Sequence, residues 1–238
     1  MIQLHNVHKT FGNKVAVNHI DLEVRPGEIF GFLGPNGAGK TTTIKMIVGM
    51  LRPDSGTVEV EGISVKDHPL EAKKKISFVP DNPEVYDMMT GLQYLNFLSD
   101  IYELSSSVRK ERIERYVSDF GMEEALRDTI GSYSHGMKQK ICLIGALIHE
   151  PDVFILDEPM VGLDPKSSFR LKEIMRERCD QGKIVFFSTH VMEVAEKLCD
   201  RLAIINQGNI IASGTLEEIQ KQAQDEGSLE KIFLELTE

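Results

Sequence analysis

The chain has 238 residues with a hydrophobic share of 41% and a charged share of 27%, which are typical of a folded globular protein and exclude a disordered or fibrous one. Its formal charge of −10 argues against a surface that coats nucleic acid. No apolar stretch approaches the ~20 residues of a membrane-spanning helix, and the first residues lack a basic region followed by an apolar run. We therefore expect a cytoplasmic chain whose three scattered cysteines are reduced packing residues.

The first third of the chain is predicted to form short strands and one helix. The strands are expected at 2–7, 15–24, 28–33 and 57–61. Alternation of apolar and polar residues over 15–24 is typical of a half-buried antiparallel strand. The strand at 28–33 runs directly into a glycine-rich loop, and the spacing of apolar residues beyond the loop predicts a helix over 41–51.

The glycine-rich loop matches the P-loop pattern, in which two glycines bracket four residues and are followed by Lys and Thr. It comprises Gly34, Pro35, Asn36, Gly37, Ala38, Gly39, Lys40 and Thr41, with Thr42 next. Glycine positions allow backbone N–H groups to surround a phosphate, and the following helix directs its positive end to the same anion. Lys40 is expected to reach the β- and γ-phosphates of a nucleotide, and the Thr41 hydroxyl to bind Mg²⁺. A glycine-rich turn that happens to precede a helix is the alternative.

From residue 90 to 149 the apolar spacing is helical, with helices predicted at 92–102, 108–120 and 137–149. We expect a helical subdomain at about 84–150, inserted in a main domain over 1–215. Strands at 153–156, 184–188 and 202–206 then alternate with helices at 166–179 and 191–198, which predicts a parallel sheet and an α/β fold. Residues 216–238 are expected to form a short acidic helical tail.

Polar residues stand at three of the predicted element ends. Asp157 and Glu158 follow an apolar strand, where one carboxylate can bind a metal ion and the other can accept a proton. Ser134 and Gly136 precede a helix and can present a hydroxyl, N–H groups and the helix dipole to an anion, although a simple serine cap explains them as well. His190 follows the strand 184–188, at the sheet edge where ligands collect in such folds.

These residues make the chain resemble the ATPases of the ATP-binding cassette (ABC) family from about Ile2 to Thr215. The resemblance also rests on 161–165 and on the segment Tyr133-Ser134-His135-Gly136-Met137-Lys138-Gln139. It implies a P-loop NTPase core with a mixed sheet, an antiparallel β subdomain and an inserted helical subdomain. It also implies that Asp157 holds Mg²⁺, that Lys40, Glu158 and His190 act in hydrolysis, and that Phe11 stacks on adenine.

The sequence departs from the family pattern at two places. Asp81 stands where the family usually has a glutamine that touches Mg²⁺ and water, and an aspartate can bind Mg²⁺ but cannot donate a hydrogen bond. His135 and Met137 replace the commonest residues of the family signature. This variant resembles the subgroup that powers exporters of drugs and polysaccharides.

The resemblance implies a working arrangement as well. Two chains, expected to be identical, would bind ATP head to tail, with Ser134 and Gly136 of one facing the γ-phosphate held by the other. A separate transmembrane permease would dock near Asp81 and 83–102, holding the chain at the inner face of the cell membrane. The alternatives are an ABC ATPase that acts on DNA or ribosomes, a P-loop kinase of another family, and a regulatory subunit with weak activity.

Overall fold

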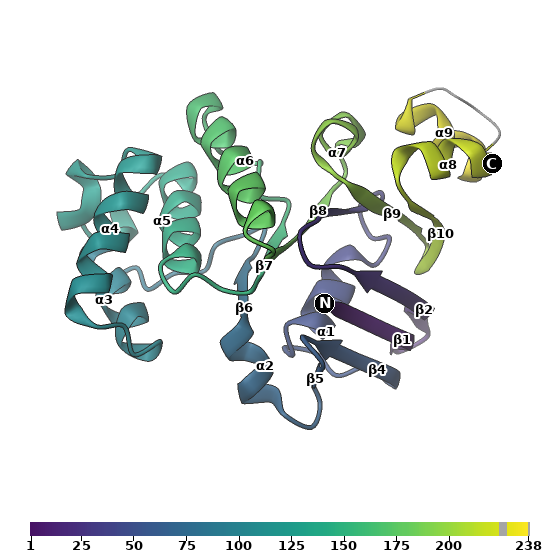
Figure 1. Ribbon diagram of the computed structural model, residues 1–238, viewed down its shortest axis with the longest axis horizontal. Helices are drawn as coiled ribbons and strands as arrows, with labels where there is room; N and C mark the ends of the chain where they lie inside the picture. Colours follow the sequence, from purple (N-terminus) through teal and green to yellow (C-terminus); the bar gives the residue numbers. More distant parts are fainter. Residues whose placement is uncertain (224–227, 238) are drawn as a thin grey trace.

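Two β-sheets and a group of helices make up the molecule (Figure 1). This computed structural model describes residues 1–223 and 228–237. The four-stranded sheet is antiparallel in the order β2-β1-β4-β5. Its strands in that order span Lys14–Val24, Ile2–Phe11, Ser55–Val60 and Ile63–Ser64. The antiparallel strand predicted at 15–24 is therefore present as β2, paired with β1 along most of its length.

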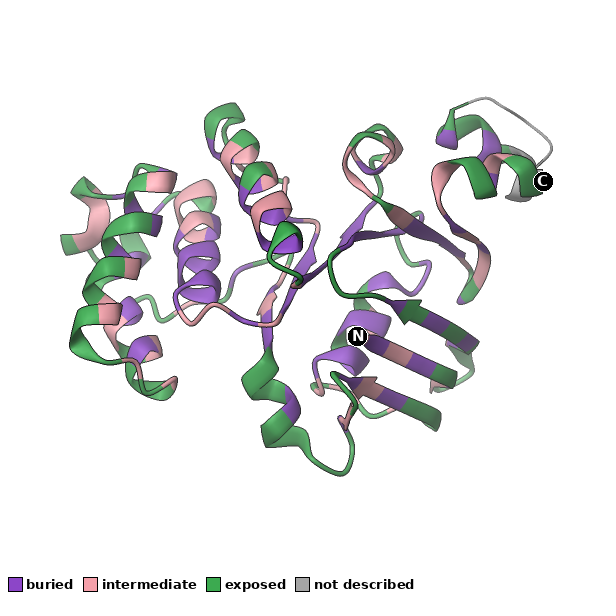
Figure 2. Ribbon diagram, viewed as in Figure 1, coloured by how far each residue is buried: buried purple, intermediate pink, exposed green. Residues whose placement is uncertain are grey.

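The second sheet has six strands in the order β10-β9-β3-β8-β7-β6. They span Asn209–Gly214, Arg201–Asn206, Ile29–Leu33, Ile184–Thr189, Val153–Asp157 and Ile76–Val79. All neighbours are parallel except β10, which runs antiparallel to β9. Every residue of β3 and β7 is buried, because elements cover both faces of the sheet (Figure 2). The predicted mixed-sheet α/β fold with an antiparallel sheet is confirmed.

Helix α1 (Lys40–Ile47) lies between the two sheets. It contacts β2 and β4 of the antiparallel sheet and β7 of the parallel sheet. Its apolar side chains belong to the same hydrophobic core as β1, β3 and β8. The helix ends earlier than the predicted residue 51 because Gly49 takes a left-handed conformation, with φ of 69°. Consequently the P-loop is attached to a helix that both sheets hold in place.

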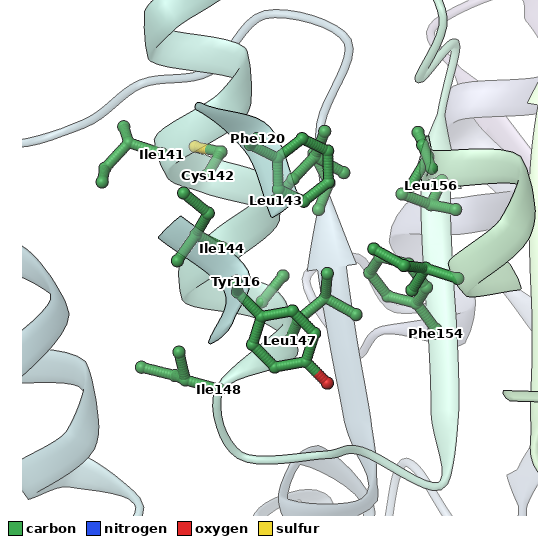
Figure 3. Close-up of a cluster of buried hydrophobic side chains, with 14 of the residues drawn as sticks. Tyr116, Phe120, Ile141, Cys142, Leu143, Ile144, Leu147, Ile148, Phe154 and Leu156 are labelled. Carbon is green, nitrogen blue, oxygen red and sulfur yellow. The ribbon is translucent and has the colours of Figure 1, made fainter. Parts of the chain in front are cut away.

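Three helices, α3 (Gly91–Ile101), α4 (Ser106–Phe120) and α5 (His135–Leu147), form a group at one end of the molecule (Figure 1). Two 3₁₀ turns, Glu124–Arg127 and Ile130–Ser132, connect α4 to α5. Buried side chains of α5 lie between α4 and strand β7, as Figure 3 shows for Tyr116, Leu143, Leu147 and Phe154. The position of α5 is thus fixed directly to the strand that ends at Asp157.

Helices α6 (Pro165–Asp180) and α7 (Met192–Leu198) follow β7 and β8, and α2 (Pro69–Lys75) precedes β6. After β10, helices α8 (Leu216–Ala223) and α9 (Leu229–Thr237) pack on the end of the six-stranded sheet. Leu229 and Ile232 of α9 are buried with Ala195 of α7 and Leu202 of β9. Over the described residues, no helix has the length and apolarity needed to span a bilayer.

Candidate functional site

The P-loop connects β3 to α1 and depends on glycine at positions where a side chain has no room. A Cβ on Gly34 would come within 2.2 Å of the Ile205 carbonyl oxygen, and one on Gly39 within 2.5 Å of the Ala16 carbonyl oxygen. Gly39 also has φ of 117°, which L-residues rarely adopt. The loop is therefore pressed against β9 and β2, and its open side carries the backbone N–H groups at the start of α1.

Lys40, the first residue of α1, has its side chain over the P-loop. Its Nζ donates hydrogen bonds to the carbonyl oxygens of Gly34 at 2.6 Å and Pro35 at 3.2 Å. The same nitrogen lies 3.5 Å from Oε1 of Glu158. A buried ammonium group held between the loop and an acidic strand end is suitably placed to bind phosphate oxygens.

Asp157 ends strand β7 and is almost completely buried. Its two oxygens accept hydrogen bonds from hydroxyl groups on different elements, Oδ2 from Thr41 Oγ1 at 2.7 Å and Oδ1 from Ser188 Oγ at 2.5 Å. Asp157 and Ser188 are paired in the parallel register of β7 and β8. The predicted metal residues Thr41 and Asp157 are therefore in direct contact, although 116 positions apart.

Glu158 adopts a left-handed backbone conformation, with φ of 49°. This costs a non-glycine residue on the order of 1–3 kcal/mol and persists only where neighbouring contacts impose it. Here the Glu158 N–H donates to Ser188 Oγ at 3.1 Å, and His190 Nδ1 lies 3.0 Å from Oε1. Lys40 and His190 thus converge on one carboxylate oxygen, which brings the three predicted catalytic residues together.

A cavity of about 260 Å³ opens between these residues. The residues that line it come from the P-loop and from the segments around it: Phe11, Lys14, Ala16, Pro35, Asn36, Gly37, Gly39, Lys40, Thr41, Thr42, Asp81, Asp157 and Glu158. Half of the Phe11 surface is exposed, and Lys9 Nζ lies 5.6 Å from the centre of its ring. An exposed aromatic ring that lines the cavity offers a stacking surface for a planar base.

Asp81 is the third carboxylate on this cavity, after Asp157 and Glu158. Desolvation and the charges of those two acids raise its pKa above the usual value. Oxygen donors from Thr41, Asp157 and Asp81 are of the kind Mg²⁺ prefers, so the residues present fit the ion. No cluster of three or more His, Cys, Asp or Glu suited to a metal occurs in residues 1–223 and 228–237.

Ser134 and Gly136 lie outside the P-loop cavity of their own chain. Ser134 caps α5, and its Oγ accepts a hydrogen bond from the Met137 N–H at 3.3 Å. A Cβ on Gly136 would lie 2.6 Å from the carbonyl oxygen of Gly162, and the His135 ring packs over Gly162. The segment 133–139 is consequently pressed against the loop that follows Glu158.

Two sets of contacts at the site were not predicted from the sequence. Ser188 bonds to both acidic residues, a role that only the register of β7 and β8 reveals. Two lysines of α5 also form ion pairs, Lys138 with Asp87 at 2.7 Å and Lys140 with Asp164 at 2.6 Å. These pairs connect the start of α5 to the segment after Asp81 and to the beginning of α6.

Comparison with known proteins agrees with this geometry. A family model described as ABC transporter matches residues 17–161. The linearmycin resistance ATP-binding protein LnrL of Bacillus subtilis is 39% identical over 92% of this chain and 70% of its own length. A solved ATP-binding subunit of an ABC transporter covers both chains fully, with a TM-score of 0.96 and 31% identity.

A dimeric ATP-binding cassette solved in a post-hydrolysis state with ADP and Pi is also similar. Its TM-score is 0.82 at 25% identity, over 91% of this chain and 99% of that one. The sequence match and the P-loop site therefore agree on one assignment. The chain belongs to the ABC transporter family and is an ATPase.

Proposed function

We propose that the chain is the ATPase subunit of a membrane exporter, in which two copies hydrolyse MgATP head to tail and drive a separate transmembrane permease. The observation that carries the ATPase site is the convergence of Lys40 and His190 on Glu158, beside the hydrogen-bonded pair Thr41 and Asp157. Each group has a chemical task in phosphoryl transfer to water.

The P-loop N–H groups and Lys40 hold the β- and γ-phosphates, and Phe11 stacks on the adenine ring. Glu158 orients the attacking water and accepts its proton, while His190 fixes the carboxylate by its contact to Oε1. Lys40 and the loop amides stabilise the negative charge that develops on the transferred group. The Glu158 N–H bond to Ser188 Oγ supports the left-handed backbone of Glu158, which lines the cavity.

Thr41, Asp157 and Asp81 are the residues we assign to Mg²⁺. When bound, the ion neutralises charge on the β- and γ-phosphates. Asp157 is prepared for this task because two hydroxyl groups already orient its oxygens.

The position of Ser134 and Gly136 outside the cavity of their own chain supports the proposed dimer. The Ser134 hydroxyl at the start of α5 is exposed and does not line the P-loop cavity of its own chain. It can therefore donate a hydrogen bond to a phosphate from outside the chain. Two-fold pairing of identical chains places these donors against the γ-phosphate bound by the partner, so two composite sites form together. The similar dimeric cassette bound to ADP and Pi supports this arrangement.

The permease is assigned to the apolar surface that begins after Asp81 and continues over α3. Its exposed side chains are Tyr86, Met88, Leu92, Phe97 and Ile101, with Met88 being 92% exposed. Tyr86 and Phe97 pack edge to face at 5.7 Å between ring centres. Large apolar side chains gathered on one surface are typical of protein contacts. A permease bound at this surface would hold the chain at the inner face of the membrane.

Export is favoured over import by the signature variant His135-Gly136-Met137-Lys138-Gln139, which resembles that of exporters. A relative named as a Nod factor export ATP-binding protein, 37% identical over 90% of this chain, supports the same direction. In this arrangement the permease selects the transported substrate.

The test replaces Glu158 with Gln, which removes the proton acceptor but keeps the size of the side chain. We expect hydrolysis to fall at least 100-fold while ATP binding persists, and the chain to elute as a dimer with MgATP in size-exclusion chromatography. Glu173→Gln, on the outer part of α6, is the matched control and should hydrolyse ATP normally. Vigorous turnover by the Glu158 variant would refute the assignment.

The permease assignment has its own test, affinity purification of the chain from detergent-extracted native membranes. A polytopic membrane protein that stimulates hydrolysis, lost with Lys40→Ala, is the expected result. Recovery of ribosomal or DNA-bound proteins alone would leave the ATPase in place and disprove transport.

A further inference from the structure

A second cavity, of about 320 Å³, lies between α1, the β4–β5 hairpin and α2, whose arrangement Figure 1 shows. It shares no lining residue with the P-loop cavity. Buried apolar side chains line its inner part, Met46 from α1, Val58 from β4 and Val65 after β5. Its volume is at the lower end of the range for small-molecule sites.

Three cationic side chains, Arg52, Lys66 and Lys73, line the same cavity. None of them has a carboxylate within ion-pair distance in the described part of the chain. The nearest acid along the chain from Arg52 is Asp54, which is engaged by Lys9 at 2.6 Å and by the Thr10 N–H at 2.7 Å. The cations are therefore available to an outside anion.

The carboxylate lining the cavity, Asp67, is engaged within its own turn. It accepts a hydrogen bond from Ser64 Oγ at 2.7 Å, and its N–H donates to the same oxygen at 3.2 Å. This turn fixes the segment that carries Lys66. Three cations against one engaged acid make the cavity locally positive, in a chain whose formal charge is −10. Such a local reversal of sign is expected to concentrate anions there.

The cationic rim and the apolar interior are also in contact. Gly49 has φ of 69°, and a Cβ at this position would lie 3.0 Å from Val65 Cγ1 and 3.5 Å from Lys73 Cε. The stem of Lys73 thus lies close to the apolar wall, in the manner of lysines that cover apolar surface and keep the ammonium group in water.

We propose that this cavity binds an amphipathic anion, with the apolar part of the ligand against Met46, Val58 and Val65 and the phosphate or carboxylate group on Arg52, Lys66 and Lys73. The ligand is either a free amphiphile or the headgroup region of an anionic lipid, since both have this chemistry. The two cavities have no residue in common, so this ligand and a nucleotide do not compete for the same side chains.

The test is calorimetric titration of the full chain with octyl phosphate below its micelle concentration. We expect saturable binding that inorganic phosphate and octanol, at the same concentration, each fail to reproduce. Arg52→Glu and Lys73→Glu should each weaken it at least tenfold. Lys74→Glu is the matched control, with the same charge change on α2 outside this cavity, and should bind as the unchanged chain does.

Unchanged ATP binding by each variant confirms that it is folded. Absence of saturable octyl phosphate binding overturns the proposal, as does equal loss in the Lys73 and Lys74 variants or equal binding of inorganic phosphate. Co-sedimentation with phosphatidylglycerol vesicles but not phosphatidylcholine vesicles, lost on Lys73→Glu, identifies a lipid as the source. Octyl phosphate binding without vesicle binding identifies a free amphiphile.

Discussion

Individual side chains at the nucleotide site depend on neighbours that a reading of motifs does not reveal. The P-loop, the acidic pair and His190 were predicted because each follows a recognisable strand and the residue types suit the chemistry. Ser188 was not, because its contacts to Asp157 and Glu158 exist only once β7 and β8 are paired. Asp157 and Ser188 are 31 positions apart, and only the pairing of their strands brings them into contact.

Replacing Ser188 with Ala removes one hydroxyl that both donates to Asp157 and accepts from the Glu158 N–H. We expect kcat for ATP hydrolysis to fall about 10–100-fold, the effect typical of groups that orient metal ligands. Affinity for ATP without Mg²⁺ should change little. Ser77→Ala is the control, since Ser77 is also buried but donates to the Ala146 carbonyl away from the cavity. Equal loss in the two variants would contradict a positioning role.

His149 gives a prediction for pH dependence. It stacks on Tyr102 with ring centres 3.6 Å apart, and burial lowers its pKa to about 4. His149 binds a proton near pH 6.5 in the unfolded chain but only near pH 4 in the folded chain. Because protonation favours the unfolded chain between these values, the free energy of unfolding decreases as the pH falls from 6.5 to 4. The contribution of His149 is on the order of 3 kcal/mol over that range.

Urea unfolding of His149→Phe, compared with the unchanged chain at pH 7 and pH 4.5, measures this effect. The phenyl ring retains the stacking on Tyr102 but has no group to protonate, so the variant should lose less stability on acidification. A pH dependence that the substitution leaves unaltered would rule out the assigned role of His149.

Among the helices and strands, those with a clear apolar period were located well, whereas a short helix without one was missed. Helix α5 starts two residues earlier than predicted, because Ser134 is its cap. Helix α2 was not predicted, since Ala72 is its one buried residue and its sequence therefore lacks an apolar stripe. Strand β1 continues to Phe11, beyond the predicted residue 7, because it pairs with β2 up to that point.

The start of α3 has a capping box, which gives a prediction about the stability of the helical group. Thr90 accepts a hydrogen bond from the Gln93 N–H at 3.2 Å, and the Thr90 N–H donates to the Gln93 side chain at 2.9 Å. Thr90→Ala should lower the free energy of unfolding by about 1 kcal/mol. Thr90→Ser keeps the hydroxyl and should recover most of it in denaturant titrations. Equal stability of the Ala and Ser variants would show that the cap contributes nothing.

At the scale of the whole molecule, the last helix is connected to the catalytic edge of the sheet. Ile232 of α9 is buried in the same cluster as Ala195 of α7, the helix that directly follows His190. Residues 216–223 and 229–237 of the expected acidic tail form α8 and α9, which pack on the sheet. The residues 224–227 and 238 of that tail lie outside the described residues.

Ile232→Ala should destabilise this packing by roughly 2–5 kcal/mol. Because α9 contacts α7, hydrogen exchange should accelerate in 192–198 and remain slow in α3 and α5. Ile113→Ala is the control, a truncation of the same size in the core cluster of the helical group. It should accelerate exchange in α3 and α5 and leave 192–198 slow. Uniform acceleration over the chain in both variants would mean that the tail is not a separate cooperative unit.

The separation of Ser134 from the P-loop cavity of its own chain has a consequence for kinetics. Under the proposed pairing, a single chain binds nucleotide but lacks the donors that complete the site. A monomer therefore binds ATP without hydrolysing it. Turnover then rises with the square of protein concentration until dimers saturate. A permease that presents two chains side by side raises their effective concentration, and thereby confines ATP consumption to assembled transporters.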